Sequence, residues 1–186
     1  MRDSWDWLHD ARASVRARGL VRDPQPVAPG LLDLASNDYL GLSRHPVVVA
    51  GAAEAAHRFG AGATGSRLVT GTTSLHLSLE QALAERMGSP AALVLSSGYL
   101  ANLAALTVLG GPGVLVVSDA SNHASIVDGC RLSRSAVRVV PHLDVAAVEA
   151  ALAGHAGRAV VVTDAVFSVD GAVAPLRALH DVVRRH

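Results

Sequence analysis

Valine-rich runs alternate with helical patterns in the second half of the sequence, and this alternation limits the fold more than any other feature. The runs predict four strands, at Ala91 to Ser97, Val114 to Val117, Val137 to Val140 and Ala159 to Val166. Helical patterns lie between them, at residues 99–109, 124–132 and 145–153. Continuous apolar strands joined by helices are typical of a parallel sheet that helices cover on both faces. We therefore expect an α/β fold with a mostly parallel sheet.

The sequence before these strands predicts helices and an extended arm. Apolar residues at helical spacing over residues 4–18 indicate an amphipathic surface helix. Prolines end this helix, and two further helices are expected at residues 46–58 and 73–87. The sequence thus divides into an N-terminal helix and arm, residues 1–45, and a main α/β region, residues 46–186.

The turn from the first predicted strand into the following helix holds Gly98 and Tyr99. The N–H groups at a helix start lack partners within the helix and lie at the positive end of its dipole. A phosphate group can therefore bind there through backbone hydrogen bonds. An ordinary strand-to-helix turn that requires a glycine is the alternative interpretation.

Polar side chains follow two later strands. His123 comes after the second predicted strand, and Asp164 and Ser168 come at the end of the fourth. Ligands of open α/β sheets bind outside the carboxyl ends of the strands, so we expect these groups to converge with the anion-binding turn. Simple capping or turn formation is the alternative for His123 and for Asp164.

A glycine-rich segment, residues 60–65, matches the G-x-G-x-x-G pattern of dinucleotide-binding proteins. That pattern functions where a strand ends and a helix begins. Here a predicted helix precedes it and a polar segment follows. We therefore interpret it as a flexible or closely packed loop, and a nucleotide-dependent oxidoreductase is an alternative that rests on this loop alone.

Charge, cysteine content and hydropathy limit the partners and the cellular locations that we expect for the chain. The formal net charge is +0 and the longest basic run is Arg184-Arg185, which argues against a nucleic-acid partner. Cys130 is the only cysteine, so no disulfide is expected within the chain and a cytoplasmic location is favoured. We expect no signal peptide, and no apolar run approaches the roughly 18 residues of a membrane span. The histidines lack partners at metal-ligand spacing, so no metal site is expected.

Five sequence blocks, in this order, resemble the α-oxoamine synthases, which are pyridoxal-phosphate enzymes of the aspartate-aminotransferase fold type. The blocks are Asn37 to Leu42, Gly65-Ser66-Arg67 with Gly71, Ser97-Gly98-Tyr99 with Asn102, Ser121 to Ser125, and Val166 to Gly171. The resemblance implies the large domain of a fold type I pyridoxal-phosphate transferase, with residues 46–186 as its N-terminal part. Within the family, the blocks look like those of members that condense L-alanine with a pimeloyl thioester in biotin synthesis.

The resemblance also implies which residues contact the cofactor, pyridoxal 5'-phosphate. The backbone around Gly98 and Tyr99 would help hold it. His123 would stack on its pyridine ring, and Ser168 would contact it. The cofactor would serve as the electron sink when the alanine α-proton is lost, before attack on the thioester and decarboxylation.

Three residues have implied roles toward the substrates. His123 would help place the amino-acid carboxylate, and Arg22 would meet the acyl substrate, although a solvated charge beside a helix end is the alternative for Arg22. Asp164, a candidate catalytic residue together with His123, stands where many relatives have glutamate. The expected acyl donor is pimeloyl-CoA or pimeloyl-acyl carrier protein, and the full-length form is expected to be a homodimer.

The chain contains no lysine, because all 16 basic residues are arginine. Family members form a Schiff base through a lysine that lies further along their sequences, and strands that lie between their first and fourth strands also come from that later part. The chain is therefore expected to be the N-terminal part of a synthase, without turnover by itself and with apolar faces uncovered. Two alternatives stay open: a synthase of the 2-amino-3-ketobutyrate CoA ligase or 5-aminolevulinate synthase type, and a non-catalytic truncated remnant.

Overall fold

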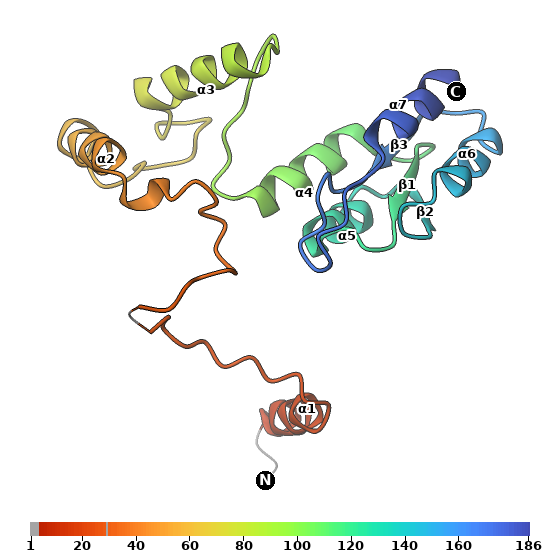
Figure 1. Cartoon of the computed structure of the whole chain (residues 1–186), viewed down its shortest axis with the longest axis horizontal. Helices are drawn as coiled ribbons and strands as arrows, with labels where there is room; N and C mark the ends of the chain where they lie inside the picture. Colours follow the sequence, from red (N-terminus) through yellow and green to blue (C-terminus); the bar gives the residue numbers. More distant parts are fainter. Residues whose placement is uncertain (1–3, 29) are drawn as a thin grey trace. The chain divides into compact units, whose positions relative to one another are not determined.

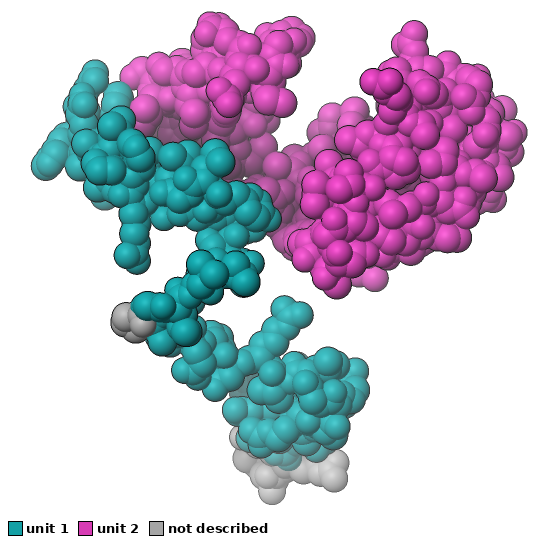
Figure 2. Space-filling model, viewed as in Figure 1, with its two compact units in different colours: residues 1–62 teal, residues 63–186 magenta. Residues whose placement is uncertain are grey.

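The computed structural model describes residues 4–28 and 30–186, which divide into two compact units, Met1–Gly62 and Ala63–His186 (Figure 2). In the first unit lie α1 (Asp6–Ala17), the short 3-10 helix η1 (Leu42–Arg44) and α2 (Pro46–Phe59). Helices α1 and α2 confirm the two helices predicted in this part of the sequence. In the described part of the chain, no helix is both long and apolar enough to cross a membrane.

The second unit contains the sheet and most of the helices. Its elements, in chain order, are α3 (Ser74–Met87), α4 (Gly98–Leu109), β1 (Leu115–Asp119), α5 (Ala124–Leu132), β2 (Ala136–Val140), α6 (Val145–Ala153), β3 (Ala159–Val162) and α7 (Leu176–Arg185). Helix α3 ends at Gly88, whose φ of 62° is the left-handed conformation that glycine adopts readily at a helix end. The alternation of strands and helices confirms the predicted α/β class.

The sheet is parallel and has the strand order β2–β1–β3 (Figure 1). Leu115 of β1 pairs with Ala136 of β2 on one side and with Ala159 of β3 on the other. The chain thus crosses from β1 to β2 on one side of it, and then crosses back past β1 to β3 on the other side. Because such crossovers are right-handed, α5 and α6 cover opposite faces of the sheet. Ligands of open α/β sheets bind at this switch point, outside the carboxyl ends of β1 and β3.

Neighbouring residues of β1 point into two different apolar cores. Val116 packs with Leu106 of α4 and Ile126 of α5 on one face. Val117 packs with Val148 of α6 and Val182 of α7 on the other face. Val116 and Val117 are both fully buried, so the central strand is covered on both sides and its carboxyl end is rigidly placed.

The first predicted strand is wrong. Residues Ala91 to Ser97 belong to no sheet, and the N–H of Val94 donates instead to Oε1 of Glu80 at 2.9 Å. A strand exists only where a neighbouring strand pairs with it, and an apolar sequence does not reveal whether that neighbour is present. The last predicted strand is also shorter than expected, because β3 ends at Val162, while Val166 forms an isolated antiparallel bridge with Val173.

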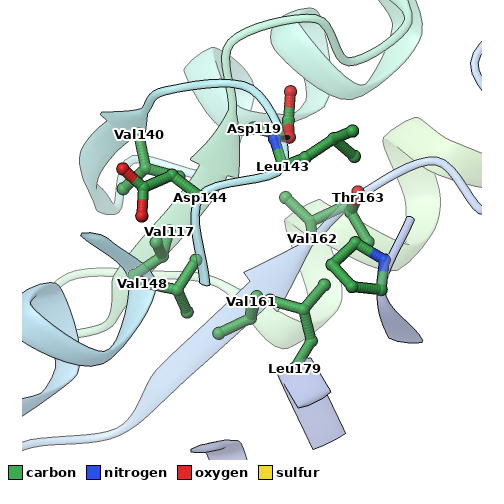
Figure 3. Close-up of a pocket in the computed structure, with 11 residues that line it drawn as sticks. Val117, Asp119, Val140, Leu143, Asp144, Val148, Val161, Val162, Thr163 and Leu179 are labelled. Atoms are coloured by element: carbon green, nitrogen blue, oxygen red, sulfur yellow. Dashed lines mark hydrogen bonds between the residues drawn. The ribbon is translucent and has the colours of Figure 1, made fainter. Parts of the chain in front are cut away.

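A narrow cavity lies under the edge of the sheet, where Val117, Val148, Val161 and Leu179 line it (Figure 3). It has space for no more than about one water molecule. Its walls are mostly aliphatic side chains. The cavity is therefore a gap in core packing and not a place for a cofactor.

Candidate functional site

Helix α4 begins with two backbone amides that have no acceptor. Ser97 is the N-cap, and its hydroxyl accepts a hydrogen bond from the N–H of Leu100 at 3.2 Å, while its carbonyl accepts one from the N–H of Ala101 at 3.0 Å. Within residues 4–28 and 30–186, the N–H groups of Gly98 and Tyr99 have no partner. A Cβ atom at Gly98 would meet nothing within 4 Å, so the space beside it is open. Two free donors at the positive end of a helix dipole fit a phosphate group.

His123 caps α5, and its hydrogen bonds select one tautomer of the ring. The N–H of Ser125 donates to Nδ1 at 3.2 Å, and the hydroxyl of Ser125 lies 2.7 Å from the same atom. Asn102 Nδ2 donates to that hydroxyl oxygen at 2.8 Å, which leaves the hydroxyl proton for Nδ1. Nδ1 is thus an acceptor, and the neutral ring carries its proton on Nε2. Capping occupies Nδ1 and leaves Nε2 and the ring face for a ligand.

Tyr99 connects the start of α4 to α5 beside the His123 ring. Its hydroxyl donates to Oδ2 of Asp128, whose other oxygen accepts from Arg131 at 3.1 Å. The hydrogen bond with Asp128 raises the pKa of Tyr99, and the same hydrogen bond lowers the pKa of Asp128. The rings of Tyr99 and His123 meet edge to face, with their centroids 6.3 Å apart. Both rings are therefore held next to the open start of α4.

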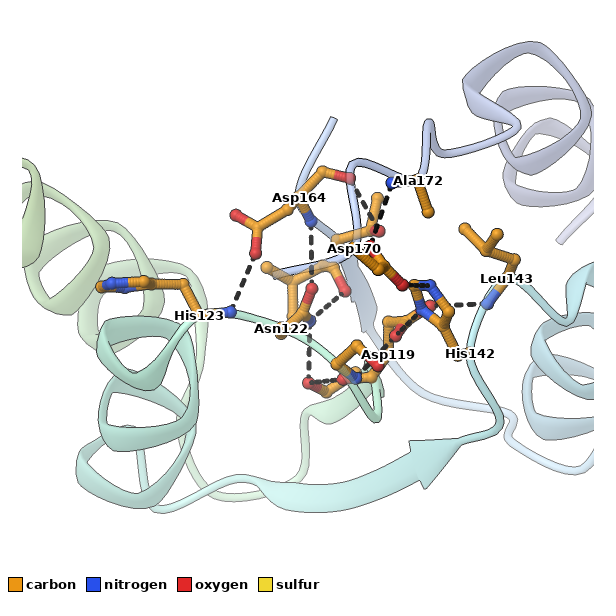
Figure 4. A network of polar contacts seen from close by, with 12 residues as sticks. Asp119, Asn122, His123, His142, Leu143, Asp164, Asp170 and Ala172 are labelled. Carbon is orange, nitrogen blue, oxygen red and sulfur yellow. Dashed lines mark hydrogen bonds and ion pairs between the residues drawn. The ribbon is translucent and has the colours of Figure 1, made fainter. Parts of the chain in front are cut away.

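Asp164 joins the ends of β3 and β1 (Figure 4). Its Oδ2 accepts a hydrogen bond from the backbone N–H of His123 at 2.8 Å, and its own N–H donates to Oδ1 of Asn122 at 3.0 Å. Asn122 Nδ2 donates to the hydroxyl of Ser118 at 3.0 Å and to the carbonyl of Val162 at 2.8 Å. The structure thus brings His123 and Asp164 together, although the imidazole of His123 points away from the carboxylate (Figure 4).

The two remaining predicted residues make no polar contact within the part of the chain that the structure describes. Ser168 is exposed on the tip of a hairpin-like turn that follows β3, with its hydroxyl free. Arg22 is exposed on the arm of the first compact unit. The structure therefore places Ser168 on an element that begins at the same sheet edge, and the role of Arg22 stays a prediction.

The sequence interpretation gave no role to three polar residues at this edge, Asp119, His142 and Asp170 (Figure 4). Nδ1 of His142 lies 2.9 Å from Oδ1 of Asp119, and Nε2 lies 3.3 Å from Oδ2 of Asp170. The hydrogen bond to Asp119 raises the pKa of His142. His142 follows β2 by two positions, so the rule that ligands and polar groups gather at strand ends would have found it had it been applied to that strand as well.

Comparison with known proteins identifies the class. The family model for aminotransferase class I and II matches residues 29–186, and the chain belongs to that family. Several curated relatives are named 8-amino-7-oxononanoate synthase. The protein from Mycobacterium sp. (strain JLS) is 60% identical over 183 residues, which are 97% of this chain and 48% of the relative. The protein from Mycolicibacterium smegmatis is 59% identical over the same share. The chain thus spans about half the length of the curated relatives that it matches.

Solved structures support the same fold. Serine palmitoyltransferase from S. paucimobilis, solved with a bound PLP-myriocin aldimine, is 31% identical with a TM-score of 0.83 and covers 100% of this chain and 53% of its own. The 8-amino-7-oxononanoate synthase from Francisella tularensis is 26% identical with a TM-score of 0.70, over 83% of this chain and 43% of its own. The structure is therefore part of the large domain of a pyridoxal-phosphate transferase, as expected from the five sequence blocks.

Proposed function

We propose that this chain forms the N-terminal part of the pyridoxal-phosphate site of an 8-amino-7-oxononanoate synthase, which condenses L-alanine with a pimeloyl thioester in biotin synthesis. One observation carries the proposal. The free amides of Gly98 and Tyr99, the oriented ring of His123 and the carboxylate of Asp164 lie at the carboxyl edge of the sheet, in a chain 60% identical to such a synthase.

The residues present fit the cofactor. The amides of Gly98 and Tyr99 supply two unused donors for its phosphate, and the space beside Gly98 is open. The ring of His123 has a free face and a free Nε2 proton, since its cap uses only Nδ1. The exposed hydroxyl of Ser168 is available for a further hydrogen bond.

Bound pyridoxal phosphate supplies an electron sink that stabilises the negative charge left when the amino-acid α-proton is removed. The residues of this chain bind and orient. His123 would cover one face of the cofactor ring and would offer its Nε2 proton to the amino-acid carboxylate. Asp164 holds the backbone of His123 through Oδ2, which leaves Oδ1 as a further acceptor in the site. Arg22 supplies a positive charge for the acyl substrate.

In this proposal the chain binds the cofactor without covalent attachment, because the sequence has no lysine for a Schiff base. We expect no turnover from the 186-residue chain alone. For the full-length form the proposal includes a homodimer, a cytoplasmic location and an acyl donor carried on CoA or on an acyl carrier protein.

An absorbance titration of the purified chain with pyridoxal phosphate tests the proposal. Wild type should bind it saturably, and borohydride reduction with peptide mapping should find no adduct beyond the N-terminal amine. His123→Asn keeps a capping acceptor for the N–H of Ser125 but removes the ring, so affinity should fall about twofold to tenfold, the range for one aromatic contact. His180→Asn, a change at an exposed histidine of α7, is the matched control. Absence of saturable binding by wild type, or an unchanged affinity in His123→Asn, refutes the proposal.

A related amino-acid specificity is the second candidate, because serine palmitoyltransferases give a TM-score of 0.83. Spectral perturbation of the cofactor complex distinguishes the two. L-Alanine should change the spectrum at lower concentration than L-serine or glycine. A preference for serine or glycine would favour another α-oxoamine synthase.

A further inference from the structure

His142 occupies a position between two carboxylates that belong to different elements (Figure 4). Asp119 is the last residue of β1, and Asp170 lies on the turn that follows β3. Nδ1 of His142 is 2.9 Å from Asp119, and Nε2 is 3.3 Å from Asp170. The contact with Asp119 has the geometry of a hydrogen bond, whereas the contact with Asp170 is an ion pair without that geometry. Because each ring nitrogen faces a carboxylate oxygen, only the imidazolium form places an N–H toward both.

The carboxylate of Asp119 is a firm anchor for this contact. Its side chain is 8% exposed, and it accepts the N–H groups of Ser121 and Leu143, each at 2.8 Å. Burial raises the pKa of Asp119, but these two hydrogen bonds and the one from His142 outweigh burial, so its pKa lies below the ordinary value. Asp119 is therefore ionised near neutral pH and cannot move without losing backbone hydrogen bonds.

The turn on the other side depends on Asp170 for its shape. Oδ1 of Asp170 accepts the N–H of Ala172 at 3.0 Å, which leaves Oδ2 for His142. The turn is closed by hydrogen bonds from Phe167 N–H to the carbonyl of Ala172 and from Gly171 N–H to the carbonyl of Phe167, both at 2.9 Å. Gly171 has a φ of 73°, so this turn requires the left-handed conformation there.

A contact between two rings also holds this turn in position. Phe167 is 2% exposed, and its ring meets the His142 ring edge to face with centroids 4.4 Å apart. Ser168 follows Phe167 directly. His142 thus touches the turn on both sides of Ser168, through Phe167 and through Asp170.

We propose that His142 is a positioning residue for the turn that carries Ser168: its imidazolium bridges Asp119 and Asp170 and so fixes Ser168 relative to the end of β1. The role of Ser168 toward the cofactor rests on the proposed function. The bridge itself does not, because every contact that makes it lies within the chain.

Because His142 titrates, the bridge between the two carboxylates is present at low pH and is lost at high pH. The charged groups that face His142 are Asp119 from β1 and Asp170 from the turn, while Asp144 on its own loop caps α6 through the N–H of Ala147. Since the pKa of His142 is raised in the folded chain, the bridge is complete below the ordinary histidine value of about 6.5 and is lost as pH rises through the higher folded value.

Solvent exchange of the Gly171 and Ala172 amides, measured by NMR without cofactor and divided by the intrinsic rate at each pH, tests the bridge. In wild type, protection should fall about twofold to fivefold across the His142 titration, the range for a partly exposed ion pair. His142→Gln and Asp170→Asn should each show the lower protection at all pH values. His180→Gln changes an exposed histidine that, among the described residues, pairs only with Asp181, and this variant should keep the wild-type fall in protection.

The inference is overturned if protection in wild type does not fall across the His142 titration. It is also overturned if protection still falls across this pH range in His142→Gln or Asp170→Asn. A purely packing role for His142 would also give a flat profile. In a second arm, pyridoxal phosphate affinity should fall about twofold to fivefold in both variants and stay unchanged in His180→Gln. Absence of binding by wild type would refute the proposed function, whereas the bridge would still be judged by the fall in amide protection.

Discussion

Arg67 and Glu80 show how a single ion pair ties three segments of the second unit together. Arg67 contacts Glu80 with both terminal nitrogens, at 2.5 and 3.1 Å, and also donates to the carbonyl of Val94 at 3.3 Å. Glu80 accepts the N–H of Val94 as well. The hydrogen bonds from Arg67 and from Val94 lower the pKa of Glu80 to about 2. The pair therefore joins the loop around Arg67, α3 and the segment that leads into α4.

Replacing Glu80 by glutamine should lower the melting temperature by a few degrees near neutral pH. The ionised group stabilises the fold above its ordinary pKa of about 4.3, and this contribution is lost as pH falls toward the folded value. The difference between wild type and Glu80→Gln should therefore disappear at about pH 2. Thermal melts across this range provide the measurement.

Glu54→Gln is the matched control for that experiment. Glu54 pairs with Arg58 at 3.7 Å, but both side chains are about 70% exposed, and such surface pairs contribute little. A Glu80→Gln variant that melts like Glu54→Gln, or a difference that persists in acid, would contradict the expected role of the Arg67 pair.

Part of the site could be predicted from the sequence alone, and the residues that could be predicted are those that follow the end of a strand. His123 and Asp164 come shortly after the ends of β1 and β3, and parallel strands bring such positions together. Asp170 could not be assigned in the same way, because it lies on a turn whose path depends on tertiary contacts. The partner of Glu80 was equally hidden, since Arg67 lies 13 residues away in a loop without a repeating pattern.

At the scale of elements, α4 and α5 pack so closely that a glycine is required between them. A Cβ atom on Gly129 would lie 2.7 Å from Cδ1 of Leu106 and 3.2 Å from the carbonyl oxygen of Asn102. Leu106 is 4% exposed, so it cannot move aside easily. The same helix pair holds Asn102 against Ser125 and so determines the orientation of the His123 ring.

Gly129→Ala should therefore destabilise the chain although alanine favours helices. Overpacking costs about 1–3 kcal/mol, which exceeds the gain of about 1 kcal/mol from helix propensity. Gly51→Ala in α2, where a Cβ meets nothing within 4 Å, should instead be neutral or stabilising. Urea unfolding of both variants measures the difference. Equal free energies of unfolding in the two variants would show that the helices can separate without cost.

The elements themselves were predictable where their signal is local. Helices α5 and α6 have the bounds expected from the sequence, 124–132 and 145–153. Whether residues Ala91 to Ser97 form a strand was not predictable, because strand pairing depends on a neighbour distant in sequence. Helix α7 was overlooked, although Leu176, Leu179 and Val182 have the spacing of a helix face.

At the scale of the whole molecule, apolar side chains remain exposed on several elements of the described chain. Val137 and Val139 of the edge strand β2 are 43% and 64% exposed, although valine-rich parallel strands are usually buried on both faces. Leu75, Leu79 and Leu83 form a row along α3 that is also exposed. These surfaces confirm the expectation of uncovered apolar faces. Exposed apolar edges of this kind promote association between chains.

The purified chain should therefore bind a hydrophobic dye and form oligomers as its concentration rises. Val137→Thr with Val139→Thr keeps the β-branched shape that suits a strand but makes the edge polar, so both signals should fall by roughly half or more. Val169→Thr changes a valine on a turn that is still more exposed, at 95%, and should have little effect, because a turn offers no strand edge for pairing. Dye fluorescence and sedimentation velocity measure the two signals. A wild-type chain that stays monomeric without binding dye would mean that these faces cover one another in solution, and the edge of β2 would then not be an association surface.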